Sequence, residues 1–175
     1  RELLNTIGID QKLGEQIPLD LTFTNEAGQS VRLGDYFGDK PIVLTLVYYD
    51  CPMLCNQVLT SLLRAMNVLA FGIGTEFDVL TVSVDPGETH DLAAAKRAEY
   101  LKNYRGRDGS NGWHFLTGDQ DQIEQLASAV GFRYEYEEQT DQYIHASGIM
   151  VLTPAGKLAR YFYGIDYPPR DLRWG

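Results

Sequence analysis

The sequence has little of what several specialised protein classes require. It contains only two cysteines, which excludes a disulfide framework built from several well-spread pairs. No apolar run reaches the roughly 20 residues of a transmembrane helix. Lys and Arg number 15 against 24 Asp and Glu, and the resulting net charge of −9 argues against general binding to nucleic acids or anionic membranes. That charge instead favours cations and basic partner surfaces.

What is present is typical of one globular domain. A chain of 175 residues has the usual length of a single domain, and 44% hydrophobic residues suffice for a core that needs no disulfide. We therefore expect one domain over residues 1–175, in which residues 1–17 form an irregular lead-in. The sequence begins at Arg1 rather than at Met. We keep open that a signal peptide or membrane anchor upstream has been removed.

Apolar and β-branched residues predict alternating strands and helices. The continuous apolar runs 42–49 and 77–84 are typical of central strands that are buried on both faces. The other expected elements, in chain order, are a hairpin over 19–24 and 30–33, a helix from the cysteines through 58–70, a helix over 90–104, a loop over 105–112, a strand over 113–116, a helix over 120–130 capped by Gly131, a strand over 133–136 and a hairpin over 147–153 and 157–163. This order is that of an α/β layered domain, in which ligands lie at the carboxyl ends of the central strands.

The two cysteines follow the first central strand directly. Cys51 and Cys55 are four residues apart, so both sulfurs lie on one face if a helix begins there. Pro52 suits the first turn of that helix, whose N-terminal N–H groups favour thiolate over thiol. Soft thiolates select Cu(I), Zn(II) or iron–sulfur centres, but two are too few for a closed zinc site. The spacing alone suits a redox pair and a metal site equally, and a metal site needs a further ligand.

The third ligand is sought among three histidines. His145 is the best candidate, because it is expected in a loop just before a strand, where it can reach the cysteines. His90 is expected at the surface, and His114, between Trp113 and Phe115, is expected to be structural.

More ordinary roles are expected for other residues near the motif. Asp85 follows the second central strand, where Asp most often serves in a turn or as an N-cap. Met53 is expected to fill a gap or contact a partner. Tyr48 and Tyr49 are expected to be packing groups.

Several blocks, in the right order from about Ile17 to Gly164, resemble the Sco/SenC family of copper chaperones for cytochrome c oxidase assembly. The matching blocks are 45–55 with its Cys-Pro-X-X-Cys motif, 81–86 ending in Asp-Pro, the Trp-containing segment 112–118, the histidine segment 143–147 and the closing segments 154–157 and 161–164. The sequence departs from the family pattern at Asp50, Met53 and Asn56 around the cysteines, and at Ala146 and Ser147 after the histidine.

The resemblance implies a fold, a ligand set and a partner. The implied fold is thioredoxin-like, with a central mixed sheet flanked by helices and an extra N-terminal β-hairpin. Copper, as Cu(I) or Cu(II), is then bound by Cys51, Cys55 and His145, with Asp85 in a secondary role. The implied partner is the copper site of cytochrome c oxidase subunit II, with another copper chaperone or a thiol reductant as further partners. The implied location is extracytoplasmic, in the periplasm or at the outer face of the cytoplasmic membrane, with an N-terminal membrane tether.

Two functions remain open on these residues. In a metallochaperone, two thiolates and one imidazole bind Cu(I) with low coordination, so that a partner's ligand can approach and take the metal. In a dedicated thiol–disulfide oxidoreductase, Cys51 and Cys55 are the catalytic pair that reduces the oxidase's copper-site cysteines. Thioredoxins carry a cis-proline opposite their active site, whereas this chain has no proline between Pro86 and Pro154. That absence weighs against a general oxidoreductase and suggests that His145 takes the proline's place.

A peroxidase is the least favoured of the three functional hypotheses. Peroxiredoxin-type sites need a threonine close before the cysteine and an arginine nearby. Thr45 is six residues before Cys51 and no arginine lies near the motif.

Overall fold

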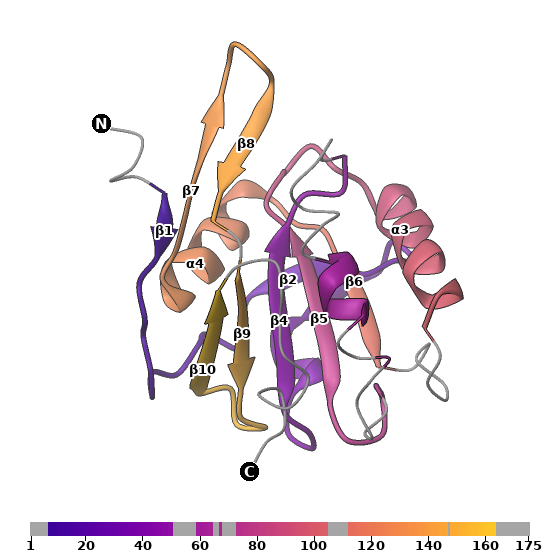
Figure 1. Ribbon diagram of the computed structural model, residues 1–175, viewed down its shortest axis with the longest axis vertical. Coiled ribbons are helices and arrows are strands. Elements are labelled where there is room, and N and C mark those ends of the chain that lie inside the picture. The colour runs from indigo at the N-terminus through magenta and orange to yellow at the C-terminus, as the bar shows by residue number, and fades with distance from the viewer. Residues whose placement is uncertain are drawn as a thin grey trace.

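The computed structural model describes residues 7–50, 59–64, 67, 73–104, 112–146 and 148–163, and its centre is a five-stranded mixed sheet (Figure 1). Across the sheet the strands are β10 (Leu158–Tyr163), β9 (Gly148–Leu152), β4 (Ile42–Val47), β5 (Asp78–Ser83) and β6 (Trp113–Leu116). The pairs β4–β5 and β5–β6 are parallel, whereas β9 is antiparallel to both β4 and β10. Both predicted central strands are therefore confirmed, and they lie side by side.

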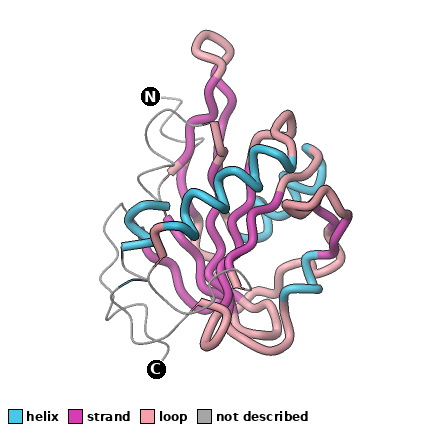
Figure 2. Tube along the Cα trace, turned by 90° about the vertical axis from the view of Figure 1, so that its right-hand side faces the viewer, coloured by secondary structure: helices cyan, strands magenta, loops and turns pink. Residues whose placement is uncertain are grey.

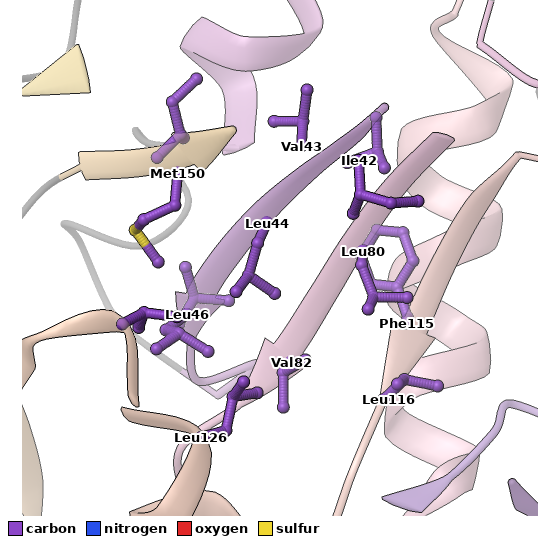
Figure 3. Packing of buried hydrophobic residues seen from close by; sticks show 14 of the residues in the cluster. Ile42, Val43, Leu44, Leu46, Leu80, Val82, Phe115, Leu116, Leu126 and Met150 are labelled. Carbon is purple, nitrogen blue, oxygen red and sulfur yellow. The ribbon is translucent and has the colours of Figure 1, made fainter. Parts of the chain in front are cut away.

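The core forms around β4 and β5 because both strands are apolar on both faces. Every residue of β4 is buried, as is every residue of β5 after Asp78. Figure 3 shows their side chains close to Met150 of β9, Phe115 of β6 and Leu126 of α4 (Gln120–Val130). Strands buried on both faces have to be covered by further layers, and helical segments lie on either side of the strands in Figure 2.

The polar groups inside this core are paired with one another. The Thr45 hydroxyl of β4 donates to the Thr81 hydroxyl of β5 over 2.9 Å, and the indole N–H of Trp113 donates to the same oxygen over 3.0 Å. A buried hydroxyl without a partner would cost about 1–3 kcal/mol. These two hydrogen bonds therefore link three adjacent strands.

The helices predicted over 90–104 and 120–130 are both present, and the first ends at Lys102, two residues earlier than predicted. The helix α3 (His90–Lys102) packs against β6, a short 3-10 helix η1 covers Leu33–Tyr36, and residues 59–64 and 67 are helical. In α4 the Asp119 side chain accepts the N–H of Gln122 over 3.0 Å, and Gly131 ends the helix in the left-handed conformation at φ 77°. Both helix predictions and the glycine cap are confirmed.

A second sheet has three antiparallel strands in the order β1 (Gly8–Ile9), β7 (Phe132–Glu137) and β8 (Gln142–His145). The β7–β8 hairpin projects from the rest of the molecule (Figure 1). A separate hairpin joins β2 (Thr22–Thr24) and β3 (Ser30–Arg32), as predicted.

Two sequence expectations about these strands are wrong. The lead-in is not entirely irregular, because Gly8 and Ile9 pair with Arg133 and Phe132. The segment before the last hairpin is not a loop, because residues 142–145 form β8. Neither strand has a strong local pattern, and β1 finds its partner more than 100 residues away. The cysteine end of the helix predicted through 58–70, the 105–111 part of the predicted loop and the tail 164–175 lie outside the described residues.

Within the described ranges, no helix is both long enough and apolar enough to cross a lipid bilayer.

Replacing Gly131 by alanine is expected to lower the free energy of unfolding by about 2–4 kcal/mol. The left-handed conformation alone costs an L-residue about 1–2 kcal/mol, and the new Cβ would lie 1.9 Å from the Asp10 carbonyl oxygen. Urea denaturation measures the loss. Gly14→Ala is the matched control, because Gly14 has φ 81° but no atom within 4 Å of a Cβ. Equal losses in the two variants would contradict a role for the Asp10 contact.

Candidate metal centre

The carboxyl ends of β4 and β5 lie at the same edge of the sheet, because the two strands are parallel. Val47 pairs with Ser83 at that edge, and the Val84 N–H donates to the Val47 carbonyl over 2.7 Å. The chain leaves β4 through residues 48–50 and leads directly to Cys51. Cys51 and Cys55 themselves lie outside the described residues, so the site is described by the groups around them.

Glu88 joins the two strand ends. Its carboxylate accepts the backbone N–H of Tyr49 over 2.7 Å and that of Asp50 over 2.8 Å. The same carboxylate accepts the hydroxyl of Ser83, the last residue of β5. A single side chain therefore holds the segment that precedes Cys51 against the end of the neighbouring strand.

The position of Glu88 follows from the turn after β5. The Asp85 carboxylate accepts the N–H of Gly87 over 2.8 Å, and the Asp85 N–H donates to the Ser83 hydroxyl over 3.1 Å. Burial raises the pKa of Glu88, and the three hydrogen bonds that it accepts act in the opposite direction. Glu88 was not predicted as a site residue from the sequence, although the Asp-Pro-Gly-Glu turn directly after a buried strand is a signal that could have identified it.

His145 is the last residue of β8 and is 7% exposed. Its ring lies edge-on to Tyr48 at a centroid distance of 6.2 Å and is 5.8 Å from the ring of Phe132. Tyr48 is three residues before Cys51, so His145 lies beside the end of β4 that leads to the cysteines. The sequence placed His145 in a loop, and the correction is that the strand pair Tyr134–His145 fixes its position.

The hydrogen bond of His145 determines which ring nitrogen carries the lone pair. Nδ1 is 2.9 Å from the carbonyl oxygen of Ala146, which can only accept. In the neutral imidazole the proton is then on Nδ1, and Nε2 carries the lone pair. Histidine ligands typically have their second nitrogen held in this way, so this side chain has the chemistry of a ligand.

The other histidines lie elsewhere. His114 is in β6 opposite Leu80, and its ring lies 4.6 Å from that of Tyr36. Burial lowers the pKa of His114. His90 begins α3 with its side chain 43% exposed. These positions agree with the structural and surface roles expected from the sequence.

Asp85 and the two tyrosines have the local roles expected of them. Asp85 serves in the turn after β5, and its carboxylate contributes, after burial, to raising the pKa of Tyr143. Tyr48 and Tyr49 are both buried. The Tyr49 hydroxyl donates to the Leu116 carbonyl over 2.7 Å, which fixes the segment from its other side.

Metal-binding clusters and cis peptide bonds can be assessed only in the described part of the chain, which does not include the cysteines. No three His, Cys, Asp or Glu side chains gather there around a position for a metal ion. No peptide bond there is cis.

Comparison with known proteins adds the family. The model of the SCO1/SenC family matches residues 10–172. The chain belongs to this family. A SCO1 protein homolog of Bacillus subtilis is 26% identical over 159 residues, which cover 86% of this chain and 75% of that protein.

Solved structures of similar proteins confirm the thioredoxin-like fold. A putative electron transfer protein from Aquifex aeolicus superposes with a TM-score of 0.80 at 28% identity, covering 91% of this chain and 89% of that one. ScoI of Arabidopsis thaliana, solved with copper bound, has a TM-score of 0.68 at 20% identity. The match covers 91% of this chain and 92% of ScoI. BsSco, a member of the Sco family of cytochrome c oxidase assembly proteins, has a TM-score of 0.69 at 23% identity. The match covers 93% of this chain and 91% of BsSco.

Glu88→Gln is expected to lower the free energy of unfolding by about 1–2 kcal/mol, because a side-chain NH₂ group then faces a backbone N–H that had an acceptor. Amide hydrogen exchange at Tyr49 and Asp50 should accelerate in the same variant. Urea denaturation and exchange on the reduced, metal-free protein measure both effects. The control is Glu76→Gln, which changes an exposed carboxylate and is expected to stay within about 0.5 kcal/mol. Unchanged exchange at Tyr49 and Asp50 would contradict the assigned role of Glu88.

Proposed function

We propose that this protein binds copper through Cys51, Cys55 and His145 and delivers it to the copper site of cytochrome c oxidase subunit II. The observation that carries the proposal is the buried His145, whose Nδ1 is held by Ala146 and whose ring contacts Tyr48, three residues before Cys51. Membership of the SCO1/SenC family and the relative solved with copper bound support copper as the metal.

The donor set suits copper, which is here the cargo rather than a resident cofactor. Thiolate and imidazole are soft to intermediate ligands that select Cu(I) and accept Cu(II). Three protein ligands leave an open approach, through which a ligand of the partner can attack and take the metal. The chain's own residues provide rigidity, since Glu88 holds the segment before Cys51, and Tyr48 and Phe132 cover the His145 ring.

The electrostatics of this edge also favour a cation. The carboxylates of Asp85 and Glu88 lie close enough to Tyr143 to add to the effect of burial in raising its pKa. Negative charge at the strand ends attracts a metal cation and basic partner surfaces. Asp85 therefore has a secondary, electrostatic role in the proposal.

The proposed location is outside the cytoplasm, on a membrane-anchored protein. Cytochrome c oxidase is a membrane enzyme, and a SCO1/SenC family member from Bacillus anthracis is a lipoprotein. The full-length protein, expressed with its native N-terminus, is then expected to fractionate with membranes.

Titration of the reduced protein with Cu(I) against a competing chelator tests the ligand set. Cys51→Ser, Cys55→Ser and His145→Ala are each expected to weaken binding by about tenfold or more, since the loss even of a ligand's supporting partner costs 10–100-fold. His90→Ala is the matched control and is expected to bind as tightly as the unmodified protein. The three-ligand model fails if His145→Ala binds copper with unchanged affinity.

A dedicated thiol–disulfide oxidoreductase is the second candidate. It is favoured by the thioredoxin-like fold and by the disulfide switch identified in BsSco. In this reaction one cysteine thiolate attacks a disulfide of the oxidase copper site, and the second cysteine resolves the mixed disulfide. Two electrons pass to the oxidase cysteines, and a Cys51–Cys55 disulfide remains.

One variant separates the two candidates. His145→Ala removes a metal ligand but neither thiol, so it should impair copper transfer while leaving disulfide reduction within about twofold of the unmodified rate, a difference that corresponds to less than 1 kcal/mol. Reduction is followed by mass spectrometry on a copper-free subunit II domain whose cysteines are oxidised. If the unmodified protein reduces that domain efficiently but binds no copper, the oxidoreductase is the correct function.

A further inference from the structure

A groove of about 620 Å³ runs between α4 and the β7–β8 hairpin. One wall is a single face of α4, because Gln120, Glu124, Ala127 and Ser128 follow one another at helical spacing. The opposite wall comes from the hairpin and is aromatic. It contains the rings of Phe132, Tyr134, Tyr136 and Tyr143.

The tyrosines share one face of the hairpin with His145. Tyr134 pairs directly with His145, and Tyr136 pairs directly with Tyr143, so all four side chains project from the same face. The ring of Tyr143 is 5.2 Å from that of Tyr136 and 6.0 Å from that of Tyr134. The three tyrosines therefore form a continuous aromatic surface that ends at the histidine.

The inner end of the groove lies at the carboxyl end of β5. Val84 and Pro86, which flank Asp85 at the end of β5, line the groove. Tyr143 contacts the ring of Tyr48 at 5.6 Å, and Tyr48 in turn contacts His145. A molecule that contacts Tyr143 in the groove would therefore be separated from His145 by the ring of Tyr48.

Acidic side chains outnumber basic ones among the residues that line the groove. Glu124 lines it from α4, which carries no basic residue in its last turn, and Glu135 lines it from β7, where it alternates with the tyrosines and projects from the other face of the hairpin. Arg133 is the only Lys or Arg among the lining residues, and its Nε lies 3.1 Å from the Asp10 carboxylate. At the outer end the Tyr136 hydroxyl donates to the carboxylate of Asp141. An anionic or purely apolar occupant is disfavoured by these carboxylates.

We propose that this groove binds an arginine-bearing segment of the partner protein. A guanidinium stacks on tyrosine faces and forms paired hydrogen bonds with carboxylates, whereas a lysine ammonium is a strongly hydrated point charge. The volume lies within the range of 300–1,000 Å³ that is usual for ligand sites. The identity of the partner rests on the proposed function, but the binding of arginine by the groove does not require copper.

The probe is the blocked peptide acetyl-Gly-Arg-Arg-Gly-amide, added to the reduced, metal-free full chain labelled with ¹⁵N and with tyrosine-ring ¹³C. Saturable NMR shifts are expected at the tyrosines of β7 and β8 and along the Glu124 face of α4. The lysine version of the peptide is expected to bind more weakly and the glutamate version not at all. The proposal is overturned if the shifts do not saturate, if they lie outside the groove, or if the lysine or glutamate peptide binds as tightly as the arginine peptide.

Two variants and two matched controls test whether Glu124 and Tyr136 contribute to the affinity for the arginine peptide. Glu124→Gln and Tyr136→Ala are each expected to weaken the arginine peptide roughly 3- to 10-fold. Glu138→Gln changes an exposed carboxylate of the same hairpin that does not line the groove, and Tyr163→Ala removes a tyrosine that is 49% exposed, close to the 45% of Tyr136. Both controls should bind the peptide normally. Equal losses in controls and groove variants would overturn the assignment.

Copper measurements on the same variants separate this proposal from the proposed function. Glu124→Gln and Tyr136→Ala should keep the Cu(I) affinity of the unmodified protein while copper transfer to a subunit II domain slows. If no copper binds but the arginine peptide still occupies the groove, the metallochaperone is wrong and the groove assignment stands. If copper binds and transfers normally in both groove variants, the groove does not serve the partner and its proposed role is wrong.

Discussion

The hydrogen bonds of Glu88 are the contacts on which the arrangement of the site depends. The two central strands are parallel, so each must leave the sheet at the same edge, and nothing in the strand ladder itself directs the chain beyond that edge. Glu88 supplies the direction, because its carboxylate binds Ser83 at the end of β5 and the backbone of Tyr49 and Asp50 beyond β4. Successive residues then point to opposite sides, with Tyr48 toward His145 and Tyr49 toward β6.

Placing carboxylates at this edge has an energetic cost and a functional consequence. Burial disfavours the ionised form of Glu88, as its raised pKa shows, and this opposes the stability gained from its hydrogen bonds. The same negative charge creates a potential suited to a metal cation and to basic groups. Under the proposed function, in which the site accepts copper and releases it to a partner, these neighbouring charges would add to the attraction provided by the ligands.

The β7–β8 hairpin joins the two functional features of the molecule. His145 lies at its base, beside the end of β4, and the tyrosines on the same face line the groove. Antiparallel pairing fixes which residues share that face, so a change of one residue in register would turn both the histidine and the tyrosines away together. The proposed metal binding by His145 and the proposed partner binding in the groove would therefore both depend on this one pairing register.

Local sequence was sufficient to predict the central strands and α4, whereas the predicted position of the cysteine pair falls outside the described residues. The runs that became β4 and β5 are apolar on both faces, and Asp119 and Gly131 mark the ends of α4, so each element is encoded by residues close together in the chain. The ordered motif blocks also indicated the family correctly. The strands β1 and β8 were missed, because a strand without a strong alternating pattern is defined only by its partner, and the partner of β1 is distant in sequence.

The sequence by itself determined the chemistry available to this protein, namely two thiols after a buried strand and a histidine among aromatic residues. Only the tertiary structure decided the orientation of that histidine, the role of Glu88 and the existence of the groove. The two backbone N–H groups that donate to Glu88 are 38 and 39 residues away in the chain, and the walls of the groove come from separate elements. Contacts of this kind leave no periodic trace in the sequence, because they form only when the sheets bring distant segments together.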